Sequence, residues 1–173
     1  CIRDRCNFSI EETAAPVVAP ENAVEVPFTH TLGKTAGEVL KYTVIDANDD
    51  TKTWKPGAFS THSVCMKPTE LDNSDDWLIS VPVHLKGGTD YSLSIKEGRA
   101  LSAGSEDIYG VYIGKEPTAE AMTVTAIEPH AVTIRDFNEK TGKFAVDTEG
   151  YYYIGIHCTS DRTKSGNLKV CDL

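Results

Sequence analysis

Short apolar segments separated by turn residues make up most of the chain. The longest runs from Asp75 to Ile95, where an almost unbroken apolar segment at 77–85 precedes a glycine turn at 86–89 and then an alternation of apolar and polar residues. An unbroken apolar segment predicts a strand buried on both faces, whereas alternation predicts a strand with one face in water. Pro82 cannot donate a main-chain hydrogen bond, so we expect the first strand to lie at a sheet edge or to break there. The pattern therefore predicts a β-hairpin over this stretch.

The rest of the pattern predicts further short strands and almost no helix, the one exception being a helical turn at 118–122. Short strands that recur about every 8 to 12 residues are typical of two packed sheets. The sequence therefore predicts an all-β fold, a β-sandwich of two antiparallel sheets, and periodicity alone leaves jelly-roll and immunoglobulin-like connectivity open. We expect these strands at residues 24–32, 40–45, 63–66, 108–113, 123–128, 132–137, 143–146, 151–158 and 168–173.

The first twenty residues differ from the rest of the chain. Pro16 and Pro20 disfavour helix at the residues before them and suit an extended linker. We expect residues 1–20 to be a linker or the tail of a preceding module, and residues 21–173 to form the sandwich. Cys1 fits the lipid-bearing first residue of a mature bacterial lipoprotein, and the alternative is a module boundary within a longer protein.

The charge balance limits the classes of partner. The chain has 17 basic and 26 acidic residues and a formal net charge of −9. Nucleic acids and anionic membrane surfaces attract basic patches, so this balance argues against both. No apolar run approaches the roughly 18 residues of a membrane-spanning helix. A cation, a neutral glycan or a basic protein remains compatible with the composition.

The five cysteines are an odd number, so at least one is free or pairs outside the chain. Cys158 and Cys171 flank a predicted turn at 163–166, and counting outward from that turn brings them opposite each other. Residues opposed in this way approach closely enough for a disulfide. The spacing predicts a Cys158–Cys171 bridge, with two facing buried thiols as the alternative.

Four segments resemble, in the same order, segments of choice-of-anchor J and gingipain-type cleaved adhesin modules. They are residues 44–54 (VIDANDDTKTW), 75–83 (DDWLISVPV), 88–94 (GTDYSLS) and 151–157 (YYYIGIH). The resemblance implies a jelly-roll β-sandwich within a large secreted or cell-surface protein of gram-negative anaerobes. It also implies adhesion or glycan binding rather than catalysis, with neighbouring modules of the same parent protein as partners.

The acidic loop at 46–50 is the strongest chemical candidate. Its oxygen-bearing side chains have the 1-3-5 spacing that begins an EF-hand, but Thr51 replaces the required glycine and Gly57 the bidentate glutamate. Two interpretations stay open: a structural calcium site completed by Asp75, Asp76 or main-chain carbonyls, or a turn whose side chains bond their own main chain. The predicted ligands within the loop are Asp46, Asn48 and Asp50.

Aromatic side chains are the second candidate, because sugar rings pack on exposed aromatic rings. The predicted ligand-binding residues are Trp54, Tyr109, Tyr112 and Tyr151. In the competing interpretation, the aromatic residues of apolar strands lie in the core, and Trp54 is also a packing residue.

Motifs for catalysis are absent from the sequence. No metal-binding histidine pair, nucleophile elbow or phosphate-binding glycine loop occurs. The two carboxylates of a glycoside hydrolase are brought together by the fold, so no sequence spacing identifies them. We therefore expect a non-catalytic module for adhesion or carbohydrate recognition, with a glycan or a surface protein as partner. The alternatives are a structural spacer without a ligand and, less favoured, a small glycosidase domain.

Overall fold

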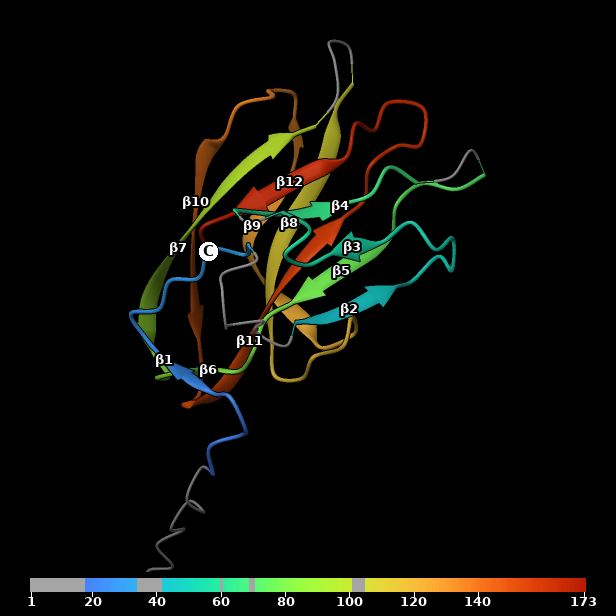
Figure 1. Ribbon diagram of the computed structural model, residues 1–173. Coiled ribbons are helices and arrows are strands. Elements are labelled where there is room, and N and C mark those ends of the chain that lie inside the picture. Colours follow the sequence, from blue (N-terminus) through green and yellow to red (C-terminus); the bar gives the residue numbers. More distant parts are fainter. Residues whose placement is uncertain (1–17, 34–41, 60, 69–70, 101–104) are drawn as a thin grey trace, which may run out of the picture.

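Two β-sheets packed face to face form the described part of the protein (Figure 1). The computed structural model describes residues 18–33, 42–59, 61–68, 71–100 and 105–173. None of these residues forms a helix, so this part of the chain has no helix that could cross a membrane. The strands are β1 (Val24–Glu25), β2 (Thr43–Asp46), β3 (Trp54–Lys55), β4 (Ser63–Cys65), β5 (Asp76–Ile79), β6 (Val83–Leu85), β7 (Thr89–Arg99), β8 (Asp107–Gly114), β9 (Met122–Val132), β10 (Asn138–Val146), β11 (Gly150–Cys158) and β12 (Leu168–Cys171).

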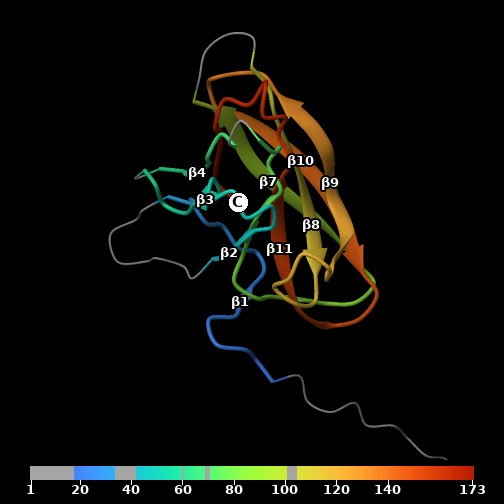
Figure 2. The same ribbon diagram turned by 90° about the vertical axis from the view of Figure 1, so that its right-hand side faces the viewer.

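The larger sheet has seven strands and is organised around β11. On one side, β11 pairs with β6 through its first residues and with β5 through its last residues. On the other side it pairs with β8, which pairs with β9, and Figure 2 shows these long strands side by side. β2 flanks β5 and β1 flanks β6. The β1–β6 pair is parallel, whereas all other pairs of described strands are antiparallel.

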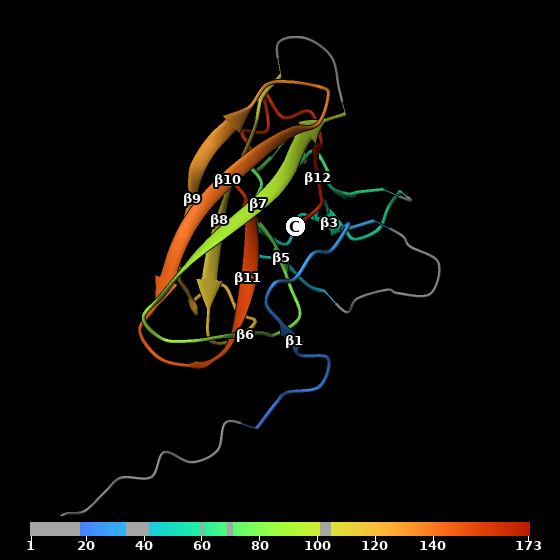
Figure 3. The same cartoon turned by 90° about the vertical axis from the view of Figure 1, so that its left-hand side faces the viewer.

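The smaller sheet has five strands in the order β10-β7-β12-β4-β3. Its longest pairing joins β10 to β7 over nine residues of each strand, and these two strands cross the front of the molecule in Figure 3. β12 pairs with β7 only along Lys96–Arg99. β10 therefore covers most of one edge of β7, whereas β12 covers only the last residues of the other edge.

Apolar side chains from both sheets fill the space between them. Leu78, Val111 and Ile156 come from the larger sheet, and Ile95 and Leu168 come from the smaller one. Each of these side chains is at most 1% exposed. Burying an aliphatic side chain of this size stabilises a fold by about 1.5–3 kcal/mol, so this shared core holds the two sheets together.

The predicted hairpin over residues 75–95 is wrong. The first segment breaks at Pro82 into β5 and β6, as one sequence alternative required, and both pieces pair with β11 in the larger sheet. β7 instead pairs with β10 and β12 in the smaller sheet. The turn at 86–89 therefore carries the chain from one sheet to the other, and each strand finds its partners far along the sequence.

Some predicted boundaries also differ from the structure. The strands expected at 123–128 and 132–137 are replaced by a single strand, β9, that ends at Val132. β10 begins at Asn138, five residues before its predicted start. The helical turn expected at 118–122 is a non-helical turn that leads into β9. Local apolar pattern located the strands but not their ends, because the ends depend on pairing with distant strands.

Candidate functional site

Aromatic side chains gather on the outer face of the seven-stranded sheet. Along β11, Tyr152, Ile154 and Ile156 point into the core, so the residues between them point to the opposite face. The ladder partners of these outward residues on β5, β6 and β8 add further rings. We call this set the aromatic face; its members are Trp77, His84, Tyr112, Tyr151, Tyr153 and His157, of which Tyr153 packs against the cluster that contains Trp77.

Trp77 is the buried base of the aromatic face. Its ring stacks on His157 with 3.9 Å between centroids and 9° between planes, and the centroid of Tyr112 lies 5.6 Å away. Two glycines leave room for these rings. A β-carbon at Gly155 would lie 3.1 Å from Cε3 of Trp77, and one at Gly110 would lie 2.9 Å from the Tyr112 hydroxyl. The rings therefore lie directly against the main chain of β8 and β11.

The three tyrosines of the aromatic face differ from the others in their hydroxyl groups. Tyr112, Tyr151 and Tyr153 are half-buried, and no residue in the described ranges accepts or donates a hydrogen bond at their hydroxyls. The hydroxyls of the remaining four tyrosines each have a hydrogen-bond partner in the protein. These pairs are Tyr42 with His30, Tyr91 with Lys86, Tyr109 with Glu97 and Tyr152 with Thr148.

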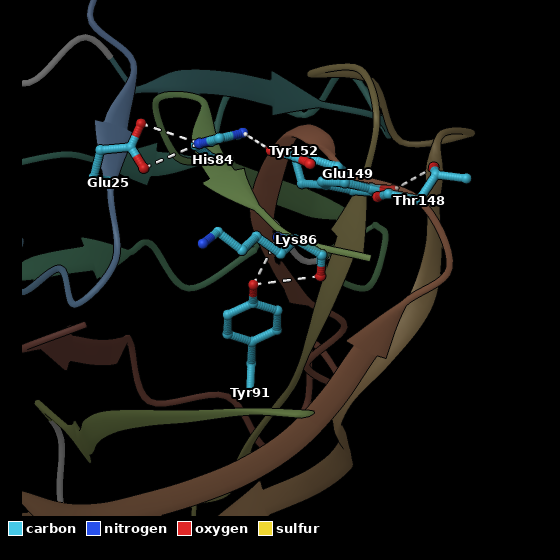
Figure 4. Close-up of polar contacts among 7 residues, drawn as sticks. All are labelled: Glu25, His84, Lys86, Tyr91, Thr148, Glu149 and Tyr152. Carbon is cyan, nitrogen blue, oxygen red and sulfur yellow. Dashed lines mark hydrogen bonds and ion pairs between the residues drawn. The ribbon is translucent and has the colours of Figure 1, made fainter. Parts of the chain in front are cut away.

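Histidine–carboxylate pairs border the aromatic face at two places. His84 stacks on Tyr151, and its two ring nitrogens lie 3.0 Å from Glu25 and 3.2 Å from Glu149 (Figure 4). These contacts tie β1 and the start of β11 to β6.

The second pair lies near the far end of β11, where Nε2 of His157 is 2.7 Å from Asp75. Burial lowers the pKa of His157, and the Asp75 carboxylate opposes that shift only in part. Burial and the nearby Glu128 carboxylate together raise the pKa of Tyr112. At neutral pH the His157 and Tyr112 rings are therefore neutral, and acidic side chains lie beside them.

A groove of about 640 Å³ opens between the two sheets, away from the aromatic face. Apolar residues of both sheets line it, including Val83 and Phe144, and the segment 26–29 forms one wall. The hydroxyl of Tyr91, also in the lining, accepts a hydrogen bond from the main-chain nitrogen of Lys86 at 2.7 Å (Figure 4). One of its acidic groups, Asp172, is paired with Lys96 at 2.7 Å. The groove is thus mainly an apolar opening of the core.

A second cluster of rings lies apart from the aromatic face. Phe59 stacks on His62 with 4.6 Å between centroids, and His62 meets Phe137 edge-on at 5.5 Å. The ammonium group of Lys169 lies 4.6 Å from the centroid of Phe137. Phe59 and Phe137 are 56% and 38% exposed. This cluster supplies accessible rings without phenolic hydroxyls, which makes it a useful comparison for the aromatic face.

Of the four predicted ligand-binding residues, the structure brings Tyr112 and Tyr151 to one surface and buries the other two. Trp54 is 3% exposed and packs in the core, so the prediction that it binds ligand is wrong. Tyr109 is 0% exposed, and its hydroxyl donates to Glu97 at 2.6 Å, so that prediction is also wrong. Hydrogen bonds from His130 and Tyr109 overcome the effect of burial on Glu97 and leave its pKa lowered.

Four members of the aromatic face, Trp77, His84, Tyr153 and His157, were not among the predicted ligand-binding residues. Tyr153 shares the alternation phase of Tyr151, opposite to Ile154, so the pattern of β11 contained the signal for it. His84 had no comparable signal, because its place beside Tyr151 depends on the pairing of β6 with β11.

The acidic loop forms a turn in which side chains bond their own main chain. The carboxylate of Asp46 accepts hydrogen bonds from the main-chain nitrogens of Asp50 and Thr51, and the Asn48 side chain donates to the carbonyl of Asn73 at 2.6 Å. Asp76 is buried opposite Asp46 on β5, whereas Asp75 pairs with a histidine. Within the described ranges, no three His, Cys, Asp or Glu side chains are placed to hold a metal ion. The Asp46 and Asn48 side chains are therefore engaged in hydrogen bonds that shape this turn.

The predicted Cys158–Cys171 disulfide is not formed. Both thiols are free and buried. The loop at 163–166 connects strands of different sheets, because β11 belongs to the larger sheet and β12 to the smaller one. The two cysteines are consequently not opposed across a hairpin.

Comparison with known proteins identifies the fold. No protein-family model matches the chain, and no curated protein matches it. Solved structures that are similar include cleaved adhesin domains of Lys-gingipain. The K3 domain from Porphyromonas gingivalis W83 has a TM-score of 0.60 at 14% identity and covers 76% of this chain and 89% of its own. The K1 domain from the same organism has a TM-score of 0.59 at 17% identity, and the K2 domain 0.52 at 19%; each covers 84% of this chain and 94% of its own. The predicted β-sandwich of jelly-roll type is confirmed.

Proposed function

We propose that this protein is a non-catalytic binding module that recognises carbohydrate through the aromatic face. The observation that carries the proposal is the set of three tyrosines whose hydroxyls have no partner within the described residues. A sugar offers C–H groups that pack on aromatic rings and hydroxyls that exchange hydrogen bonds with phenols. Tyr112, Tyr151 and Tyr153 present both kinds of contact on one sheet face.

The charges around these rings favour a neutral or cationic sugar over an acidic one. Glu25, Glu149 and Asp75 border the face, and the formal net charge of the chain is −9. Carboxylates repel uronic or sialic acid groups but accept hydrogen bonds from neutral sugar hydroxyls. The proposed ligand class is therefore a neutral oligosaccharide.

The proposed setting is a secreted or cell-surface protein of which this chain is one module. The support is the shared fold of the cleaved adhesin domains, together with the sequence segments that resemble their family. The partners in this proposal are a glycan and neighbouring modules of the same parent protein. Fold is a weak guide to function, so the ligand-binding claim depends on the aromatic face.

A glycan-array screen tests the proposal. The wild-type protein would be compared with a Tyr151→Ala/Tyr153→Ala variant and with a Phe59→Ala/Phe137→Ala variant, which removes the separate ring cluster. We expect neutral oligosaccharide signals that fall at least tenfold in the tyrosine variant and persist in the phenylalanine variant. Circular dichroism would confirm that both variants are folded.

Other outcomes of the screen would contradict the proposal. Signals lost only in the phenylalanine variant would move the binding site to the other cluster. The absence of any signal from the folded wild-type protein would favour the structural spacer instead.

A further inference from the structure

Two buried thiols face each other across the sandwich. Cys65 lies in β4 of the smaller sheet and Cys158 at the end of β11 in the larger sheet. Both side chains belong to the core and are 2% and 1% exposed. The two cysteines lie where the sheets pack together. No covalent link joins them there, since both thiols are free.

The neighbours of the two thiols fix this arrangement. Asp76 is the ladder partner of Cys158 on β5, and directly opposed residues of an antiparallel pair share one face of the sheet. The carboxylate of Asp76 accepts a hydrogen bond from the Cys65 thiol at 3.8 Å from Sγ. Cys158 therefore points to the same space as Cys65, and Asp76 is a neighbour of both residues.

We propose that Cys65 and Cys158 form a disulfide that links the two sheets when the protein folds under oxidising conditions. The oxidant is a small-molecule disulfide such as oxidised glutathione. One cysteine thiolate attacks a sulfur of the oxidant and releases one glutathione thiolate. The second cysteine thiolate attacks the mixed disulfide, forms the S–S bond and releases the second glutathione. The two cysteines lose two protons and two electrons, and the oxidant becomes two molecules of glutathione.

The surroundings divide the roles of the two thiols. The neighbouring Cys65 thiol lowers the pKa of Cys158, and a hydrogen bond with Ser160 adds to this effect. Burial raises the pKa of Cys65, and the charges of Asp76 and Asp107 act in the same direction. Cys158 is thus the better nucleophile of the pair. Formation of the bond removes only one weak S–H donor from Asp76.

Cys171 does not compete for this bond. It lies at the end of β12, and its neighbour Val170 belongs to the core, so Cys171 points to the other face of the smaller sheet. Its charged surroundings are Asp172, Lys96 and Lys169, all outside the core. Cys171→Ser is therefore a matched control for Cys158→Ser.

The test is refolding of the full chain in a glutathione redox buffer, followed by alkylation and a non-reducing peptide map. We expect a cross-linked peptide that contains Cys65 and Cys158 in the wild-type protein and in Cys171→Ser. We also expect the melting temperature to rise by about 5–15 °C over the reduced protein, since a disulfide that closes a long loop is among the more stabilising ones. In Cys158→Ser, the cross-link and this rise should both be lost.

Two results would overturn the proposal. The first is alkylation of both Cys65 and Cys158 after oxidative refolding of the wild-type protein. The second is a cross-link of either residue to a different cysteine. Both are read from the wild-type map, so a cysteine variant that fails to fold does not prevent the test.

Discussion

The indole nitrogen of Trp54 donates a hydrogen bond to the main-chain carbonyl of Asp76 at 3.1 Å, and so joins β3 of the smaller sheet to β5 of the larger one. The sequence assigned Trp54 to ligand binding and Asp76 to metal binding. The structure instead makes them partners in holding the sandwich together.

Replacing Trp54 should weaken the fold and leave ligand binding intact. Trp54→Phe removes the indole donor and part of a buried ring, so we expect a loss of about 1–3 kcal/mol in the free energy of unfolding, measured in urea. Phe59→Ala, at a ring that is 56% exposed, is the control and should change stability little. Loss of glycan binding in a fully folded Trp54→Phe protein would return Trp54 to the binding site.

The buried carboxyl of Asp76 should make stability depend on pH. Burial raises its pKa to about 7 from the ordinary 3.8, and the charges of Asp46 and Asp50 contribute. The folded state therefore binds this proton more tightly than the unfolded state. The contribution of the protonated Asp76 carboxyl to the free energy of unfolding is fully present below about pH 4 and is lost as the pH rises to about 7.

The variant Asp76→Asn isolates this effect. Under reducing conditions, the free energy of unfolding of the wild-type protein should fall relative to that of Asp76→Asn between pH 5 and pH 8. The lowered pKa of His157 acts in the opposite direction in both proteins and cancels in the comparison. Asp90→Asn, at an exposed position, is the control. A constant difference between wild type and Asp76→Asn across this pH range would contradict the account.

The packing of the aromatic face depends on Gly155. A β-carbon there would lie 3.0 Å from Sδ of Met122 and 3.1 Å from the Trp77 ring, so Gly155→Ala should cost about 1–3 kcal/mol in chemical unfolding. Gly150→Ala on the same strand is the control, because its nearest contact is an ordinary 3.9 Å. Equal stability of the two variants would show that the face tolerates added bulk.

Calcium binding by the acidic loop stays a prediction of the sequence. If the ion binds there, the melting temperature should be higher in millimolar calcium than in chelator. When the free calcium concentration is 100 times the dissociation constant, binding stabilises the folded state by about 2.7 kcal/mol. Asp46→Asn should abolish the difference. Identical melting curves would contradict calcium binding and leave the hydrogen-bonded turn as the role of Asp46.

The elements of the fold were predictable from local pattern, whereas their pairing was not. Alternation in β7 separates the buried Leu93 and Ile95 from the exposed Ser92 and Ser94, as predicted. Pro82 marks the break between β5 and β6 because it lacks a main-chain donor. The assignment of β7 to the opposite sheet depends on contacts with β10 and β12, which no local signal encodes.

The candidate site was predictable in part for the same reason. Tyr109 and Tyr112 lie on one strand and point to opposite faces. Tyr109 alternates in phase with the buried Val111 and Ile113, whereas Tyr112 has the opposite phase. Alternation was therefore sufficient to separate them. Trp54 lies in a strand of two residues, which is too short to show a phase.

The most direct test of the proposed binding face is a titration of the strongest array ligand against single tyrosine-to-phenylalanine variants. These variants keep the ring and remove the unpartnered hydroxyl. We expect Tyr112→Phe, Tyr151→Phe and Tyr153→Phe each to raise the dissociation constant about two- to tenfold. Tyr91→Phe, whose hydroxyl is already bonded to Lys86, should leave it unchanged. Wild-type affinity in all three variants would contradict the claim that these hydroxyls contact the ligand.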